Sequence, residues 1–398
     1  MTDASNTVEV RIGGRRFAGW KSVRIEMGIE QIARAFALEV TEKFPGSSDF
    51  GVFRGGDLVQ VFIGADLVCT GWITSTPIKY DGKSITVQIQ GKSRTVDLVD
   101  CCPPSAAYAS KATRTDTWAG VKGKSSDEAP AKTAASQKPQ TSWKGLPASK
   151  IVAALAAPYG VSVKDEAGVL SKIATHTVNP GETVLASINR LITKANMVVT
   201  DDEAGNLVIA EAGGGGMAAD ALELGVNILS GSAAFDSSKR FSRYVTLGQH
   251  AGTDADFGRA AAEDKGSASD HEVGRFRLLV LKDLGQSSGG TAVERAQFEA
   301  NYRAAAAQAA AYTVPGWRQS DGSLWRQNLA LRVEDVVLGI SEYLVITKVV
   351  FRLGAAGMTT TLDVMDPRGY TRSVPTTTKG KSPGSQWAGV REKPEESK

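Results

Sequence analysis

A strict alternation of apolar and polar residues recurs in this chain, and it constrains the fold more than any other feature. It is clearest in GGDLVQVFIGADLVCTGWITS, residues 55–75. Val59, Val61 and Ile63 lie on one side of this segment, a Gly-Ala-Asp turn breaks the run, and a second run follows at once. Alternation with a period of two around a short Gly/Asp turn is typical of an antiparallel hairpin.

Similar alternating segments fill the first hundred residues. They are centred near Val10, Ile25, Leu38 and Val87, and turns rich in Gly and Asp separate them. About six short strands of this kind predict a small β-barrel or sandwich over residues 1–102. Hydrophobic residues make up 42% of the 398 residues, which is enough for several cores and fits two to four domains.

The opening pattern returns near the other end of the chain. A shift of 277 residues, without a gap, places Val59 on Val336 and Ile63 on Ile340, with six identities over the 33 positions from 57 to 89. The matching turn and inward-facing positions favour two related small β-barrel domains, one at each end. Because any two amphipathic hairpins can be superposed, a chance match stays open.

The composition of the segment between these two patterns changes twice along the chain. Residues 103–145 are rich in Ser, Ala, Thr, Lys and Pro, with seven Lys/Arg against three Asp/Glu, which predicts a flexible basic linker or insertion. A basic arm that grips a polyanion is the alternative. Residues 146–212 combine helical spacing at Ile151 and over 183–195 with a hairpin around DDEAGN, so we expect a small α/β module.

The last part of the chain is expected to be mainly β. We assign residues 213–370 to the second barrel domain, after the hinge-like GGGG at 213–216. Alanine has the highest helix propensity, so the Ala-rich stretch at about 291–312 predicts one long inserted helix. The tail, residues 371–398, is polar and rich in Pro, Gly and Thr, and we expect it to be disordered.

The sequence gives little support for catalysis or metal binding. His176, His250 and His271 fall in different expected elements, and H-E-x-x-H does not occur. Three cysteines make no disulfide framework, and no apolar run is long enough to cross a bilayer. A formal net charge of +3 indicates no general attraction to nucleic acid or to anionic membrane. We therefore expect no catalytic residues, no metal and no cofactor.

One aromatic motif stands out, GWRQSDGSLWRQN at residues 316–328. Asp and Gly are typical turn residues, so a turn is expected between the two tryptophans. The motif has two interpretations, packing on its own barrel or contact with another subunit. Its signature residues are Trp317, Asp321, Gly322, Trp325 and Asn328.

Several segments resemble, in the same order, the baseplate hub protein of Mu-like contractile-tailed phages, the gene P product. They are GGRRFAGWKSVRIEMGIEQIARAFALEV, GADLVCTGWITS, ITVQIQGKSRTVDLVDCC, APYGVSV, the α/β segment ending in DDEAGNLVIA, and GWRQSDGSLWRQN. The fit is poor only between about 104 and 141. The resemblance implies a structural protein rather than an enzyme, with two related barrels and smaller α/β parts in each subunit.

The same resemblance implies a homotrimer. Six similar barrels would surround one axis, join the tail tube to the central spike, and enclose a channel for genome delivery. The implied partners are the chain itself, the tail spike protein, and the tail tube or a tube-adaptor protein, with baseplate wedge proteins as further contacts. DNA would only pass through the channel, and no membrane partner is expected.

The implied location is the tail baseplate of the virion, with assembly in the host cytoplasm. Two other functions compete with this one. A tail-tip cell-wall hydrolase would cleave peptidoglycan. A glycan- or DNA-binding module would be retained on glycan, or would bind DNA through residues 103–145 in a salt-sensitive way.

Overall fold

The structure is a computed structural model that describes most of the chain. The described residues are 4–29, 32–42, 53–81, 85–104, 140–168, 172–195, 197–249, 264–286, 289–355 and 357–370. The expected disordered tail, 371–398, and most of the expected linker, 103–145, lie outside these residues.

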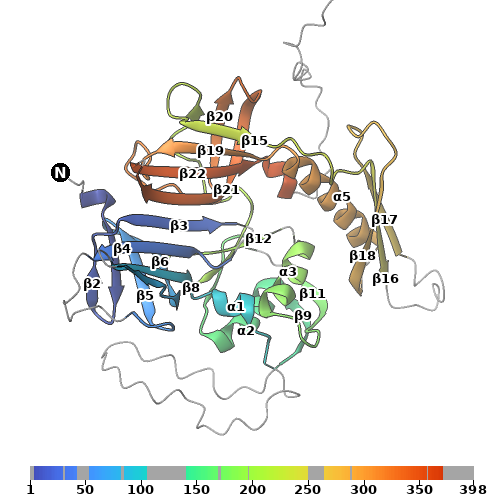
Figure 1. Ribbon diagram of the computed structural model, residues 1–398. Coiled ribbons are helices and arrows are strands. Elements are labelled where there is room, and N and C mark those ends of the chain that lie inside the picture. Colours follow the sequence, from blue (N-terminus) through green and yellow to red (C-terminus); the bar gives the residue numbers. More distant parts are fainter. Residues whose placement is uncertain are drawn as a thin grey trace, which may run out of the picture.

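The N-terminal part is an antiparallel sheet built from the alternating segments (Figure 1). Inward-facing residues such as Val10, Ile25, Leu38 and Val61 are buried, as the alternation predicts. A short helix, α1 (Val96–Asp100), follows the last strand. The strands are β1 (Val8–Ile12), β2 (Arg15–Phe17), β3 (Ser22–Gly28), β4 (Ala35–Glu42), β5 (Leu58–Ile63), β6 (Asp66–Ser75), β7 (Ile78–Tyr80) and β8 (Ile85–Ser93).

The middle part is the α/β module. It has one sheet in the order β10-β13-β12, a β9–β11 pair, and two helices whose apolar faces share one core. The helix expected over 183–195 is confirmed as α3. The expected linker end is wrong, because β9 begins at Ser142, where its backbone pairs with β11. The elements are β9 (Ser142–Pro147), α2 (Ala148–Ala156), β10 (Val163–Asp165), β11 (Lys172–Thr177), α3 (Val184–Ala195), β12 (Val198–Asp201) and β13 (Leu207–Ala210).

The C-terminal part contains a second sheet region and a side lobe. The Ala-rich helix is α5 (Gly289–Ala306), so the expected end at 312 is wrong, since Ala310–Pro315 form a strand that pairs with β22. None of the described helices is long and apolar enough to cross a bilayer. The strands are β14 (Leu222–Glu223), β15 (Ser230–Ala233), β16 (Arg243–Gln249), β17 (Asp264–Ser269), β18 (Leu278–Gln286), β19 (Ala310–Pro315), β20 (Ala330–Asp335), β21 (Ile340–Gly354) and β22 (Gly357–Met365).

Two sheet regions of the chain repeat one strand order. The N-terminal path is β5-β6-β8-β4-β3, and the C-terminal path is β20-β21-β22-β19-β15, with the strands in the same chain order in both. We call these five-strand units the N-terminal and C-terminal repeats. The gap-free shift of 277 residues is wrong in register. Val336, which it set on the buried Val59, lies in the four-residue turn before β21 and is 88% exposed.

The two repeats form one continuous sheet rather than two barrels. Val23–Gly28 of β3 pair antiparallel with Lys348–Leu353 of β21, which joins the repeats in a sheet of fourteen described strands. Among the described strands no pairing closes either repeat, so the expectation of two barrels is wrong. The physical reason is local, because β21 already occupies the edge of β3. A single apolar core runs through both repeats.

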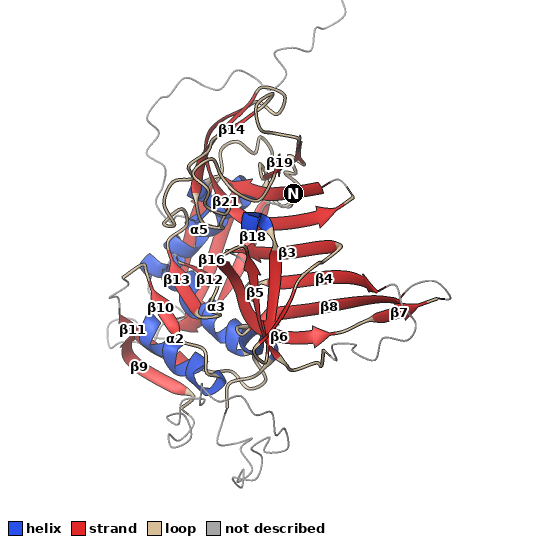
Figure 2. Cartoon of the chain, turned by 90° about the vertical axis from the view of Figure 1, so that its left-hand side faces the viewer, coloured by secondary structure: helices blue, strands red, loops and turns tan. Residues whose placement is uncertain are grey.

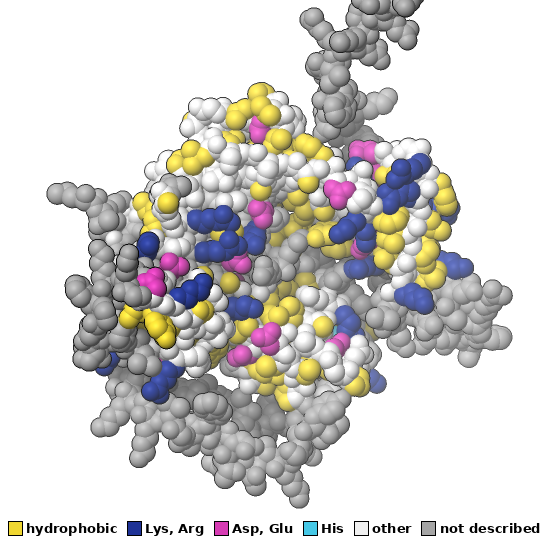
Figure 3. Space-filling model, in the orientation of Figure 1, with side chains coloured by type: hydrophobic (Ala, Val, Ile, Leu, Met, Phe, Trp, Pro, Cys, Tyr) yellow, Lys and Arg dark blue, Asp and Glu magenta, His cyan; other side chains and the backbone are white. Residues whose placement is uncertain are grey.

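The side lobe of the C-terminal part packs α5 against the sheet β17-β16-β18 (Figure 1). Ala296 and Ala300 of the helix are buried with Tyr244 of β16. Gly266 of β17 lies so close to the backbone of Ala292 that no side chain would fit between them. The face visible in Figure 3 shows hydrophobic and basic side chains together over this lobe.

Candidate functional site

The motif at residues 316–328 forms a loop between β19 and β20, which we call the Trp loop. Trp317 is 1% exposed, and its indole N–H donates to the carbonyl oxygens of Arg352 and Thr359, at 3.1 and 3.2 Å. Its ring lies 6.1 Å from that of Phe351, centroid to centroid. Trp325 is also buried in the same core. Both tryptophans therefore pack on their own repeat.

The expected Asp-Gly turn is confirmed at the exposed tip of the Trp loop. The Asp321 carboxylate accepts hydrogen bonds from the Oγ and the backbone N–H of Ser323, at 2.7 and 2.8 Å. These bonds stabilise the charged form and hold the pKa of Asp321 below its ordinary value. Gly322 has φ +85°, a left-handed conformation that glycine adopts without steric cost.

Asn328 ties the end of the Trp loop to the glycine-rich segment after the α/β module. Its Oδ1 accepts from the Gly213 N–H at 2.7 Å, and its Nδ2 donates to the Glu211 carbonyl at 2.9 Å. Its backbone carbonyl accepts from the Gly215 N–H at 3.1 Å. The side chain is almost completely buried, and φ is +66°. Asn328 thus fixes the path of the chain between the module and the C-terminal repeat.

Gln319 and Ser320 hold the next part of the same segment. The Gln319 Oε1 accepts from the Ala219 N–H at 2.7 Å, and the Ser320 N–H donates to the Asp220 Oδ2 at 2.8 Å. Together with Asn328, these bonds anchor residues 211–220 along the Trp loop. The connection at GGGG, which was expected to be a flexible hinge, is therefore fixed by hydrogen bonds.

Arg318 connects the Trp loop to the N-terminal repeat. Its guanidinium forms an ion pair with Asp66 at 2.7 Å and donates to the carbonyl oxygens of Ser5 and Ile63, at 2.7 and 3.1 Å. Asp66 is the first residue of β6 and directly follows the turn of the hairpin at residues 55–75. Sequence reasoning did not single out Arg318; its only signal was a cation directly after Trp317.

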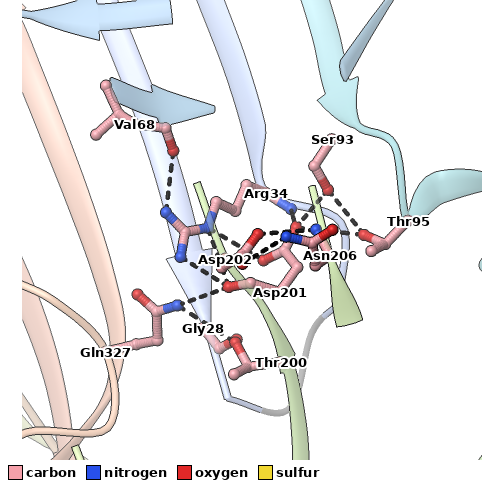
Figure 4. A network of polar contacts seen from close by, with 10 residues as sticks. All are labelled: Gly28, Arg34, Val68, Ser93, Thr95, Thr200, Asp201, Asp202, Asn206 and Gln327. Atoms are coloured by element: carbon pink, nitrogen blue, oxygen red, sulfur yellow. Dashed lines mark hydrogen bonds and ion pairs between the residues drawn. The ribbon is translucent and has the colours of Figure 1, made fainter. Parts of the chain in front are cut away.

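A second polar cluster lies where the N-terminal repeat meets the module (Figure 4). The Arg34 guanidinium contacts the Asp201 carboxylate at 3.2 Å, donates to the Asp201 carbonyl at 2.7 Å, and reaches the Val68 carbonyl at 2.9 Å. The hydroxyls of Ser93 and Thr95 donate to the same carboxylate. Asp201 is completely buried and Arg34 is 7% exposed, so each buried charge has its partner.

The C-terminal part also reaches this cluster. The Gln327 amide donates to the Asp201 carbonyl and to the Thr200 hydroxyl, both at 3.3 Å, and that hydroxyl donates to the Gly28 carbonyl at 2.9 Å. We call this set of bonds around Arg34 and Asp201 the junction network. It joins three parts of the chain at one buried point. Sequence reasoning missed it, because DDEAGN was interpreted only as a hairpin turn.

Two of the potentially reactive side chains in the described residues, Cys69 and His176, are buried. Burial raises the pKa of the Cys69 thiol to about 12, and the Asp201 carboxylate acts in the same direction, so the thiol stays protonated at neutral pH. His176 is buried, with its Nε2 2.8 Å from the Ser187 hydroxyl. His271 is exposed, and His250 lies outside the described residues. Throughout the described ranges, no three His, Cys, Asp or Glu side chains gather as metal ligands would.

Comparison with protein families assigns three separate parts of the chain. Residues 7–93 match the N-terminal domain of Mu phage baseplate assembly protein GpP-like, and residues 133–211 match the second domain of baseplate hub protein gp44-like. Residues 288–373 match the fourth domain of Mu phage baseplate assembly protein GpP. The chain is a member of the Mu-like baseplate hub family. It is thus a virion protein of the contractile tail.

Relatives of this hub agree along nearly its whole length. Baseplate hub protein gp44 of Escherichia phage Mu is 28% identical over 396 residues, covering 97% of this chain and 94% of the relative. The 43 kDa tail protein of prophage MuSo2 from Shewanella oneidensis has 25% identity and a TM-score of 0.74, with 92% and 99% of the two chains covered. A tail protein from Neisseria meningitidis MC58 shares the fold, with a TM-score of 0.69 at 20% identity and coverage of 92% and 98%.

Proposed function

We propose that this hub acts as a homotrimer that joins the tail tube to the central spike. The observation that carries the proposal is the repeat of one strand order within each chain. Three chains would supply six similar units around one axis. A three-fold spike could then meet a six-fold tube without either changing its symmetry. A closed cyclic assembly of this kind is the common way for identical chains to satisfy each other's surfaces.

The proposed role is structural and needs no catalysis. Its work is done by burial and by strand pairing between neighbouring chains. The channel enclosed by the trimer would pass DNA during genome delivery. The tail spike protein, the tail tube or a tube-adaptor protein, and baseplate wedge proteins are the proposed partners. Assembly would take place in the host cytoplasm before the tail is complete.

The absolute mass of the purified protein tests this proposal. Light scattering across a concentration series should give a stable species with three times the mass of one chain. A monomer at every concentration, which persists when the spike protein is co-expressed, would overturn the proposed symmetry adaptor. A trimer that appears only on co-expression would support it and assign nucleation of the ring to the spike.

A further inference from the structure

The contact between the two repeats inside one chain is a strand pairing with a defined register. The edge of β3 accepts the second half of β21, with Ile25 opposite Phe351 and Val23 opposite Leu353. Ile25 and Phe351 are completely buried by this contact, and Val23 is 1% exposed. The first half of β21 pairs with β20 instead, so one edge of this long strand is shared by two neighbours, while its other edge pairs with β22.

Each of these positions has an equivalent in the other repeat. When β8 is aligned with β22 so that the buried Val87 and Ile89 match Thr360 and Leu362, the strands that pair with β8 and β22 also align with each other. Ile78 faces Val87 as Phe351 faces Thr360, and Tyr80 faces Ile85 as Leu353 faces Met358. β7 is therefore the counterpart of the half of β21 that pairs with β3.

The same alignment extends to the edge strands. Leu38 faces Ile89 as Tyr312 faces Leu362, and Phe36 faces Gly91 as Ala310 faces Val364. One strand further out, Val23 and Ile25 of β3 correspond to Gly231 and Ala233 of β15. β15 is thus the counterpart of the strand that accepts β21.

The two counterpart strands have free edges within the described part of the chain. β7 pairs only with β8 there, and β15 only with β19. The Pro77 carbonyl accepts from the Gln88 N–H, so the alternation of an antiparallel ladder turns the backbone groups of Ile78 and Tyr80 to the outer edge. Their side chains are 62% and 82% exposed, although their equivalents in the C-terminal repeat lie in the joined sheet. Figure 2 shows β7 at the outer end of the N-terminal repeat.

We propose that β7 of one hub chain pairs antiparallel with β15 of the next chain and repeats between chains the β21–β3 pairing found within each chain. This inference rests on the proposed trimer and names its contact surfaces. The pairing is heterologous, because β7 and β15 are different strands, and three such contacts close a ring. Six equivalent strand junctions then surround the axis, three within chains and three between them. An exposed apolar edge strand is otherwise prone to aggregation, which the contact prevents.

The register of the β7–β15 pairing follows from that of the β21–β3 pairing within each chain. Ile78 lies opposite Ala233, and Tyr80 lies opposite Gly231. A large aromatic side chain across from an edge glycine is a favourable cross-strand pair, because the ring covers the bare backbone. In the β21–β3 pairing large residues face large ones, whereas in the β7–β15 pairing large residues face small ones. This difference distinguishes the two pairings, so β21 does not take the place of β7.

Charged substitutions on β7 test the proposed edge. Ile78→Asp and Tyr80→Asp should each convert the trimer into monomer in light scattering at concentrations where the unaltered protein is fully trimeric. Both side chains are exposed in one chain, so the thermal unfolding midpoint of the monomer should not change. Val336→Asp is the matched control, since Val336 is also an exposed apolar residue but lies in the β20–β21 turn. Trimers that survive both β7 substitutions would overturn the proposed edge.

Cross-linking tests the register independently. Cys101 and Cys102 are first replaced by serine, which leaves only the buried Cys69. Ile78→Cys combined with Ala233→Cys should then give covalent species up to three chains with a short bis-maleimide, and none beyond three. The single cysteine variants and the pair of Ile78→Cys with Val336→Cys serve as controls and should stay unlinked.

The outcomes separate this inference from the proposed function. A trimer that forms normally and gives no Ile78–Ala233 link shows that the chains associate through other surfaces, and only the edge pairing fails. Absence of a trimer in the unaltered protein, with spike present, removes the proposed function itself. Linked species longer than three chains would mean that the edges pair without closing a ring, which contradicts both.

Discussion

Asn328 shows how a single residue fixes the connection between two parts of the hub. Its φ of +66° places a side chain in the left-handed region, which costs roughly 1–2 kcal/mol relative to an ordinary conformation. Its side chain offsets this cost by serving both the Gly213 N–H and the Glu211 carbonyl. Asparagine is among the few residues that tolerate this conformation, so the position requires both its shape and its amide.

We expect Asn328→Ala to lower the free energy of unfolding by about 2–4 kcal/mol, since both backbone groups lose a buried partner and the strain remains. Asn328→Gly loses the same bonds but relieves the strain, so its loss should be smaller by about 1 kcal/mol. Urea unfolding followed by tryptophan fluorescence measures both. Equal losses in the two variants would show that the left-handed backbone carries no cost here.

At the residue scale, the sequence predicted the turn and the apolar character of the Trp loop, but not its polar contacts. Trp317 and Trp325 are large and flank an Asp-Gly pair, so a buried aromatic loop follows from local chemistry. Arg318 and Asp201 gave no comparable signal. An isolated cation or carboxylate usually lies in solvent, and only its partner, distant in the chain, shows that it is buried.

Among the elements, the β12–β13 hairpin depends on one carboxylate. Asp202 accepts from Lys164 at 2.6 Å, and from the side chain and the backbone N–H of Asn206, both at 2.8 Å. Burial opposes ionisation, but these contacts outweigh it and hold the pKa of Asp202 below its ordinary value. A carboxylate with a lowered folded pKa stabilises the fold above its unfolded pKa, and this contribution is lost as the pH falls through the folded value.

Asp202→Asn should therefore destabilise the hub at pH 7 by about 1.5–3 kcal/mol, the usual size of hydrogen bonds to charged groups. The difference from the unaltered protein should shrink as the pH is lowered below about 4, where Asp202 takes up a proton first in the unfolded chain and, at still lower pH, in the folded chain. Urea unfolding at a series of pH values measures this difference. A difference that stays constant down to pH 2 would assign the effect to shape rather than charge.

At the element scale, the sequence predicted the strands better than their lengths and partners. Alternation marks a half-buried strand directly, which is why the N-terminal strands were found. The end of α5 was misjudged because alanine favours a helix locally, whereas Ala310 and Ala311 pair with β22. The register of the repeat was misjudged because two turns differ in length, and a gap-free comparison cannot represent this.

For the whole molecule, the junction network predicts a cooperative unit rather than separate domains. Arg34→Met would leave the Asp201 carboxylate buried without its cation, which typically costs 3–5 kcal/mol. Adding Asp201→Asn to Arg34→Met should recover part of that loss, because the unpaired charge is removed. Chemical unfolding of the single and double variants tests this. If the double variant is no more stable than Arg34→Met, the buried charge is not what destabilises the single variant.

At the same scale, the joined sheet was beyond what the sequence could predict. The β3 and β21 segments each alternate as edge or central strands do, and neither carries a mark of its partner. The sequence pattern correctly favoured two related units. It could not show that one unit closes the edge of the other, because that depends on the meeting of residues at opposite ends of the chain.

The β3–β21 pairing also has a consequence for folding during synthesis on the ribosome. Gly28 and Lys348 are about 320 residues apart, so at a typical 5–20 residues per second roughly 15–60 s pass between the emergence of the two strands from a ribosome. During this interval the edge of β3 has no native partner, while neighbouring nascent chains on the same messenger present identical edges. The rate of translation through the middle of the chain therefore bears on how much protein reaches the correct pairing, independently of its final stability.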